Sequence, residues 1–412
     1  MRARERNWRW LCACACAVAA LTACGGGDAD QQAQDPFRNN SNPNAELGPR
    51  DSVLFWTPSQ QQASYPNMDR IFTTRTISRM SGSPHAVYDL PAAPIDLAAF
   101  SYTYAGRSYS LAEFAERNRV AGLLMIKAGR VLHESYRFGH TRDTRWTSFS
   151  IAKSITSMLI GAAVRDGYIG SLDEPVATYI PELRGSVYDG VTVRHLLQMS
   201  SGVQWNEDYS DPQGDVARVG TVLREGGIPA FTEFMTGHPR VAAPGTVFRY
   251  NTGETDLLGI LLKNATHQDL STYLSQKVWS QFAMEADAFW VVTTDGLEVA
   301  ACCLSATLRD FGRFGIFAMR GGTLADGTRI VPDDWLQRSI TASPASADYG
   351  YLWWLFPTNN FAAIGVFGQS IHLFPQDELV VVMQSFWPAD GGPEYAAHRS
   401  AFLSALRVTL TQ

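Results

Sequence analysis

Strand-forming sequence at two distant places in the chain constrains its fold more than any other feature. Residues 120–126 and 131–138 are two β-rich runs around the turn Lys-Ala-Gly-Arg, and they predict a hairpin. Near the C-terminus the pattern predicts a strand over 364–374, a strand over 379–386 and then a helix over 395–410. Because an isolated hairpin is only marginally stable, we expect these two parts of the chain to meet in one mixed sheet.

The sequence between these strands is mainly helical. Apolar residues recur at three- and four-residue steps from Ser150 until Gly167 stops the pattern. Further helices are predicted over 193–199, 255–265, 270–279 and 307–320. We therefore predict an α/β (α+β) fold, in which a sheet lobe carries a second, mostly helical lobe inserted at roughly residues 170–300.

The first 23 residues indicate an export signal. Four arginines precede an apolar run over 11–23 that is too short to span a bilayer. The run ends in Leu-Thr-Ala-Cys24-Gly, which resembles the bacterial lipoprotein signal, whose cysteine is lipidated and becomes the first residue of the mature protein. An ordinary secretory signal cleaved nearby is the alternative. We expect export in either case, and lipidation at Cys24 would anchor the chain to a membrane, facing the periplasm or the cell surface.

Polar sequence rich in Gly, Gln and Asn follows the proposed lipidation site. Residues 24–50 contain little that a core could bury, so they predict a flexible tether, and the folded domain is predicted to span 51–412. The formal net charge of −6 would become −9 after removal of residues 1–23. A nucleic-acid partner is not expected, because no basic stripe is available to neutralise phosphates.

The cysteines of the folded part predict neither a disulfide nor a metal site. Outside residues 1–24 only Cys302 and Cys303 occur. Adjacent cysteines rarely pair with each other, and no second pair is present to complete a zinc site. We predict that both are small buried apolar residues, and we expect no metal and no organic cofactor.

The tetrad Ser150-Ile-Ala-Lys153 is the strongest candidate for chemistry. The chain has no G-x-S-x-G elbow, no H-E-x-x-H motif and no Walker loop. Residues i and i+3 share one helix face, with Cβ atoms about 5–6 Å apart, so the lysine amine could take the serine proton and activate the hydroxyl. At a helix start, Ser150 would also lie where backbone N–H groups and the helix dipole stabilise an oxyanion. A capping serine beside a surface lysine is the alternative interpretation.

Lysine can act as a base near neutral pH only if its pKa falls by about three units. The sequence Trp-Thr-Ser-Phe before Ser150 and the apolar helix after it predict packed surroundings that could depress the pKa of Lys153. Tyr250, in a predicted turn just before the helix at 255, could share the proton. A tyrosine beside a lysine cation is pulled toward the phenolate, and the pair then titrates as a unit.

Ser150-x-x-Lys153, Tyr250 about a hundred residues later and a Gly-rich C-terminal strand together resemble a known family. This is the family of class C β-lactamase and penicillin-binding-protein-like serine hydrolases, closest to the branch that includes 6-aminohexanoate-dimer hydrolase. The resemblance covers roughly residues 50–410. Supporting stretches are Trp56-Thr-Pro, Asn67-Met-Asp-Arg-Ile-Phe, Thr192-Val-Arg-His-Leu-Leu-Gln-Met-Ser-Ser-Gly, Asn206-Glu-Asp-Tyr-Ser-Asp-Pro, Ser305-Ala-Thr-Leu-Arg-Asp-Phe-Gly-Arg-Phe-Gly and Tyr349-Gly-Tyr-Leu-Trp-Trp.

The resemblance implies a β-lactamase/transpeptidase-like fold, an antiparallel sheet flanked by helices with the active site between the two lobes. Ser150 would be the acylated nucleophile, and Lys153 with Tyr250 would handle its proton. The backbone N–H groups of Ser150 and Val366 would form the oxyanion hole.

Two departures from the family pattern bear on the substrate. Thr252 stands where the lactamases have the asparagine of Tyr-x-Asn, and Ala363-Ile364-Gly365 replaces Lys-Thr-Gly or His-x-Gly. No cation is therefore present there to bind a substrate carboxylate. Both departures count against efficient β-lactam turnover and resemble the dimer-hydrolase branch, so we predict Thr252 and Gly365 as substrate-binding positions.

The sequence also predicts roles for several other residues. Tyr209 is predicted to line the cleft, with a surface loop as the alternative. Trp353 and Trp354 are either core residues or an aromatic wall for a linear acyl chain. His195 is predicted to be structural, and Ser370 lies in a strand pattern without a base.

We therefore predict a serine hydrolase that cleaves small linear amides or carboxylic esters through a Ser150 acyl-enzyme. A β-lactamase or DD-peptidase is one alternative. The other is a binding or sensor protein that keeps the scaffold and has lost turnover.

Overall fold

The computed structural model describes residues 46–80, 86–388 and 392–411. The predicted signal peptide, Cys24 and the first part of the tether lie outside these residues. Contacts with the folded body begin before residue 51, because Gly48 is buried and its N–H donates to Ser64 Oγ at 2.8 Å. Within the described ranges, no helix has both the length and the apolar character that crossing a membrane requires.

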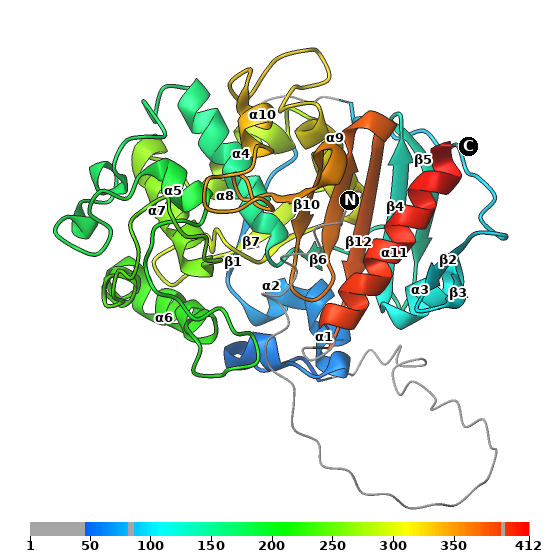
Figure 1. The fold of residues 1–412 in the computed structure, drawn as a ribbon, viewed down its shortest axis with the longest axis horizontal. Helices are drawn as coiled ribbons and strands as arrows, with labels where there is room; N and C mark the ends of the chain where they lie inside the picture. The colour runs from blue at the N-terminus through cyan, green and yellow to red at the C-terminus, as the bar shows by residue number, and fades with distance from the viewer. Residues whose placement is uncertain (1–45, 81–85, 389–391, 412) are drawn as a thin grey trace, which may run out of the picture.

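A six-stranded antiparallel sheet forms the centre of the larger lobe (Figure 1). Its strand order is β5-β4-β12-β11-β10-β9, so the early hairpin pairs with the C-terminal strands through β4 and β12, where Leu124 lies opposite Val382. This confirms the prediction that the two parts of the chain share one sheet. The strands are β4 (Val120–Lys127), β5 (Arg130–Tyr136), β9 (Trp354–Phe356), β10 (Asn360–Ile364), β11 (Ser370–Phe374) and β12 (Leu379–Ser385).

The prediction of one strand over 364–374 is wrong. β10 ends at Ile364, the chain turns over residues 365–369, and β11 returns antiparallel from Ser370. Gly368 has φ +92°, and a Cβ on it would collide with the Trp387 ring. The apolar residues around the turn hide it from a periodicity analysis, because they stay buried in the hairpin as they would in a continuous strand.

Helices cover both faces of this sheet, because its side chains alternate between two cores. Leu124 and Val380 belong to the core beneath α9 (Leu308–Met319), whereas Leu123 and Val381 belong to the core beneath α11 (Gly392–Thr411). Glycines let α9 lie close to the sheet, since a Cβ on Gly315 would meet Val380 Cγ1 at 2.7 Å. Strands buried on both faces explain the nearly continuous apolar sequence of β4 and β12.

The second lobe is mostly helical and lies on the opposite side of α4 (Ile151–Arg165) from the main sheet in Figure 1. Its helices are α5 (Val193–Leu197), α6 (Asp215–Thr236), α7 (Thr252–Thr266) and α8 (Leu270–Leu274). The predicted helix over 270–279 is α8 followed by a π-helical turn over 275–279. The sequence analysis missed α6, which is kinked at Gly227 just before Pro229.

A smaller antiparallel sheet, β1-β7-β8-β6, lies between the two lobes (Figure 1). Its strands are β1 (Thr74–Ile77), β6 (Trp146–Thr147), β7 (Ala288–Val291) and β8 (Leu304–Ala306). The remaining elements are α1 (Pro58–Ser64), α2 (Met68–Ile71), β2 (Ser101–Tyr104), β3 (Arg107–Ser110), α3 (Leu111–Arg117) and α10 (Trp335–Ser339).

Candidate active site

Ser150 and Lys153 lie on the first turn of α4, and their side chains meet. Ser150 is the N-cap residue, but its hydroxyl bonds none of the helix amides. Lys153 Nζ donates to Ser150 Oγ at 2.9 Å, and the lysine side chain is only 1% exposed. This geometry excludes the alternative of a capping serine beside a surface lysine.

The residue before the nucleophile candidate holds an unusual backbone conformation. Phe149 has φ +43°, in the left-handed region that residues with a Cβ rarely occupy, and it is buried in an aromatic cluster. Such a conformation costs on the order of 1–3 kcal/mol and persists only where surrounding contacts enforce it. Those contacts come from β8, because Leu304 O accepts from Ser148 N at 2.7 Å. The strained turn places Ser150 at the start of α4, where the residue is half-exposed.

Tyr250 completes the cluster from the helical lobe. It precedes α7, and its hydroxyl is near enough to the Ser150 side chain for that contact to lower the pKa of the phenol. Lys153 Nζ lies 5.2 Å from the centroid of the Tyr250 ring. Trp354 stacks on the same ring at 5.5 Å between centroids, and Tyr349 meets it edge-on at 5.9 Å. Residues about a hundred positions apart in the sequence therefore form one serine–lysine–tyrosine cluster.

Burial determines the protonation of this cluster. It lowers the pKa of Lys153 from 10.5 to about 8, although the charges of Glu207 and Asp256 oppose the shift. Burial also raises the pKa of Tyr250, and the charge of Glu207 raises it further. The expectation of a tyrosine pulled toward phenolate is therefore wrong: the resting phenol is neutral, and the lysine is the group whose pKa moves toward neutral pH.

Asp256 is an electrostatic partner of Lys153 that the sequence analysis missed. It is 2% exposed on α7, and its Oδ1 accepts from the N–H of Ala301 at 3.0 Å. The carbonyl of Ala301 in turn accepts from Lys153 Nζ at 3.1 Å. Burial raises the pKa of Asp256 to about 7, and the Lys153 charge opposes that rise. A carboxylate within the apolar sequence of α7 was a signal that could have identified it.

Glu207 is a second missed carboxylate, and it explains where two predicted residues lie. Its carboxylate accepts from the Tyr209 hydroxyl at 2.6 Å and from the Thr252 N–H at 3.0 Å, and also from the Thr252 hydroxyl and the Trp205 indole. The structure thus brings Tyr209 and Thr252 to the catalytic cluster. The hydroxyl of Thr252 points to Glu207, so it organises the loop that borders Tyr250.

The end of β10 lies directly beside the nucleophile candidate. A Cβ on Gly365 would be 2.8 Å from Ser148 O and 3.1 Å from Phe149 Cβ. Within the described residues, the backbone N–H groups of Ser150 and Val366 donate to no other group. Two free N–H groups beside a nucleophile are the arrangement that an oxyanion hole requires.

Replacing Gly365 by alanine is expected to impair activity, because the new methyl group would displace β10 from the Ser148 backbone. We expect kcat/KM to fall by about 10²-fold, the cost of a misplacement on the order of 1 Å. Gly220→Ala on α6 is the matched control. A Cβ there meets nothing within 4 Å, so that variant should keep its activity and gain up to about 1 kcal/mol in stability. Steady-state ester hydrolysis measures the activity of each variant, and thermal unfolding measures its stability. Full activity in Gly365→Ala would contradict the expectation.

The structure distinguishes the roles of the other candidate residues. Trp353 is a core residue, 1% exposed, whereas Trp354 is half-buried against Tyr250 and can form an aromatic wall. His195 is structural, since its Nδ1 accepts from the Thr192 N–H at 3.1 Å in a capping box. Ser370 is fully buried in β11, and no base is near enough to bond its hydroxyl.

The prediction for the two body cysteines is wrong. Cys302 and Cys303 form a disulfide with each other in the segment between β7 and β8, and both are half-buried. Local composition gives no indication of this pairing, because it depends on a backbone turn in which Cys303 has φ +70°.

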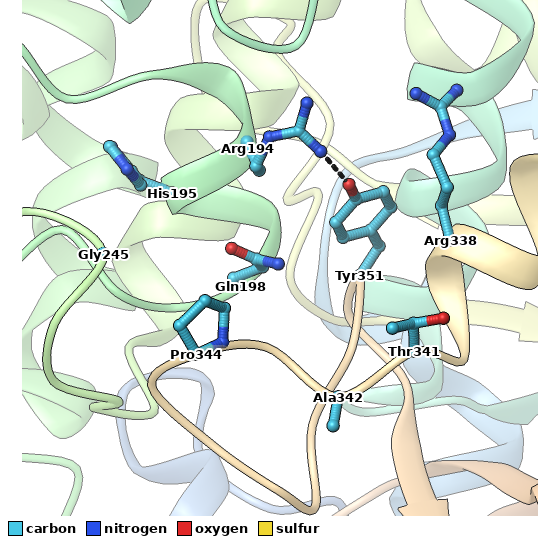
Figure 2. Close-up of a pocket in the computed structure, with 9 residues that line it drawn as sticks. All are labelled: Arg194, His195, Gln198, Gly245, Arg338, Thr341, Ala342, Pro344 and Tyr351. Carbon is cyan, nitrogen blue, oxygen red and sulfur yellow. Dashed lines mark hydrogen bonds between the residues drawn. The ribbon is translucent and has the colours of Figure 1, made fainter.

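A separate surface pocket of about 480 Å³ lies beside Tyr351 (Figure 2). In it the guanidinium of Arg194 donates to the hydroxyl of Tyr351. None of the serine–lysine–tyrosine cluster lines this pocket, so it is distinct from the candidate active site. Its lining residues are Arg194, His195, Gln198, Gly245, Arg338, Thr341, Ala342, Pro344 and Tyr351.

An antiparallel sheet between helices, with a helical second lobe and this cluster at the start of α4, defines a β-lactamase/transpeptidase-like protein. The profile of the beta-lactamase family matches residues 111–403, and the chain belongs to this family.

Two relatives of the chain are named as hydrolases. The 6-aminohexanoate-dimer hydrolase of Paenarthrobacter ureafaciens is 31% identical over 318 residues, which is 72% of this chain and 80% of that protein. Esterase EstB of Burkholderia gladioli is 28% identical over 42% of this chain and 43% of its own length.

Solved structures share the fold. A Bacillus anthracis protein assigned as a 6-aminohexanoate-dimer hydrolase superposes with a TM-score of 0.78 at 22% identity, covering 89% of this chain and 99% of that one. A penicillin-binding protein homologue from Pyrococcus abyssi gives a TM-score of 0.56 at 20% identity, covering 71% and 76%.

Proposed function

We propose that this protein is a serine hydrolase that cleaves small linear amides or carboxylic esters through an acyl-enzyme on Ser150. The contact between Lys153 Nζ and Ser150 Oγ at 2.9 Å, in a site that buries the lysine, carries the proposal. Serine needs such a base, because its hydroxyl is a weak nucleophile at its ordinary pKa.

In the acylation step, neutral Lys153 takes the Ser150 proton as Oγ attacks the substrate carbonyl carbon. The carbonyl oxygen becomes an oxyanion, which the N–H groups of Ser150 and Val366 would stabilise. Tyr250, neutral and near the Ser150 and Lys153 side chains, is placed to give its proton to the leaving amine or alkoxide and to regain one from the Lys153 ammonium. The C–N or C–O bond breaks, and the acyl group remains on Ser150.

Deacylation repeats these steps with water as the nucleophile. The Lys153–Tyr250 pair accepts a proton from water as its oxygen attacks the ester carbonyl. The tetrahedral intermediate collapses, Ser150 Oγ recovers its proton, and a carboxylic acid leaves.

Two features of the site support small linear substrates. The end of β10 is Ala363-Ile364-Gly365, which offers no cation for a substrate carboxylate. Half-buried Trp354 and the Tyr209 loop border the catalytic phenol with aromatic surface suited to an alkyl chain, while Tyr349 is buried and supports the Tyr250 ring from its edge. The relatives named for an aminohexanoate dimer and for an ester support the same substrate class.

A substrate panel tests this proposal against its rivals. We expect turnover of short p-nitrophenyl esters and of linear aminohexanoate oligomers, with slow or no turnover of the cephalosporin nitrocefin. Efficient nitrocefin hydrolysis would instead favour a β-lactamase or DD-peptidase, which the penicillin-binding-protein-like fold also permits. Absence of a Ser150 adduct after a fluorophosphonate probe would favour a binding protein that does not turn over substrate.

The pH dependence of kcat/KM is expected to reflect Lys153. The amine must be neutral to accept the Ser150 proton, so activity should be low at acid pH and rise with an apparent pKa of about 8. Asp256→Asn removes a negative charge that raises the pKa of Lys153, so this rise should move to lower pH. Asp143→Asn, at an exposed position, is the control and should leave the midpoint in place. A midpoint that stays or moves upward in Asp256→Asn would contradict the assignment of the rise to Lys153.

A further inference from the structure

The Cys302–Cys303 disulfide restricts the backbone of the segment between β7 and β8. Because the two bonded residues are consecutive, the bridge closes a small ring around their own peptide bond. Cys303 lies in the left-handed region at φ +70°, which residues with a Cβ rarely adopt. The ring therefore favours a turn that two free cysteines would adopt much less readily.

The residues on the N-terminal side of the bridge hold the catalytic base. Ala300 O accepts from Thr156 Oγ1 on α4 at 2.9 Å. Ala301 O accepts from Lys153 Nζ at 3.1 Å, and Ala301 N donates to Asp256 Oδ1 at 3.0 Å. This short stretch of backbone thus fixes the lysine and its carboxylate partner at the same time.

The residue on the C-terminal side of the bridge fixes the backbone that leads to the nucleophile. Leu304 O accepts from Ser148 N at 2.7 Å, and Leu304 N lies 3.2 Å from Ser148 Oγ. Ser148 precedes the strained Phe149 and then Ser150. The disulfide therefore lies between the backbone that holds Lys153 and the backbone that holds the Ser150 turn.

We propose that the Cys302–Cys303 disulfide is a positioning group for the Ser150–Lys153 pair, and that its reduction by a dithiol slows acylation. The inference rests on the proposed roles of Ser150 and Lys153. Reduction breaks the S–S bond, and the dithiol supplies two electrons and two protons, so that two cysteine thiols and one oxidised dithiol result. Both sulfur-bearing residues are half-buried, which leaves them accessible to a small reductant.

The test compares the oxidised protein with protein that has been reduced by dithiothreitol and desalted without oxygen. Peptide mass spectrometry after alkylation verifies the state of Cys302 and Cys303. A fluorophosphonate probe then reports the rate and the final extent of Ser150 labelling. We expect the rate to fall by roughly tenfold or more at unchanged extent, since a misplacement on the order of 1 Å costs about 10²-fold. Reoxidation should restore the original rate.

The Cys302→Ser, Cys303→Ser double variant is the second arm. It should label as slowly as the reduced protein, show a shifted midpoint in its pH profile and give no response to dithiothreitol. Equal labelling rates in both redox forms would overturn the inference while leaving the proposed function intact. A reduced extent at unchanged rate would also overturn it, because that result means partial unfolding. No labelling of Ser150 in either form would refute the proposed function and this inference together.

Discussion

Replacing Ser150 by alanine is expected to reduce kcat/KM for short p-nitrophenyl esters by on the order of 10⁴–10⁶-fold, as loss of the nucleophile does in other serine hydrolases. The hydroxyl accepts from Lys153 Nζ and caps no helix amide, so its removal takes away the attacking atom without removing a cap of α4. The thermal unfolding midpoint should therefore stay close to that of the wild type.

The matched control is Ser157→Ala on the same helix. Ser157 is fully buried, and its hydroxyl has no hydrogen-bond partner in the described part of the chain. That variant removes a more deeply buried hydroxyl two turns away on the same helix and should retain full activity. Retained turnover in Ser150→Ala, or equal loss in both variants, would refute the assignment of the nucleophile.

Lys153→Met is expected to give the second-largest loss, on the order of 10³-fold in kcat/KM, because general bases contribute about 10²–10⁴-fold. Methionine fills similar space without the amine, so Ser150 keeps its position and loses its proton acceptor. A buried amine that is replaced by an apolar side chain of similar volume costs little stability. The unfolding midpoint should remain within about 5 °C of the wild type.

Lys277→Met is the matched control for the lysine. Lys277 is 29% exposed and pairs with Asp166 at 2.6 Å, far from the cluster in sequence and without a contact to Ser150. Surface ion pairs contribute about 0–1 kcal/mol, so this variant should lose little stability and no activity. A Lys153→Met enzyme that hydrolyses esters at the wild-type rate would show that another group accepts the serine proton.

Much of the architecture follows from local sequence patterns. The hairpin β4–β5, the helices α4, α7 and α9, and the meeting of β4 with β12 are confirmed, because each depends on apolar periodicity that survives into the packed structure. The prediction of one strand over 364–374 failed because buried turn residues have the same apolar character as strand residues. The helix α6 was missed because its three glycines and its proline obscure a helical pattern.

In the candidate active site, too, some residues were predicted from the sequence and others were missed. Spacing together with the family resemblance predicted Ser150, Lys153 and Tyr250 as site residues, and the structure brings their side chains together. Glu207 and Asp256 were missed, since their importance depends on which atoms they face: Thr252 and Tyr209 in one case, Ala301 in the other. The phenolate expectation failed for a related reason, because burial and the charge of Glu207 both raise the pKa of Tyr250.

The sequence by itself determined which residue types could perform acyl transfer, which helix would carry two of them, and that the ends of the body would share a sheet. These properties are local, or they follow from the need of strands to pair. Only the tertiary structure decided that the Lys153 amine is excluded from solvent and that the Tyr250 phenol stays neutral. It also decided that Cys302 and Cys303 are joined beside the lysine. Solvent exclusion and long-range hydrogen bonds decide protonation and strain, and both arise from segments that meet only after folding.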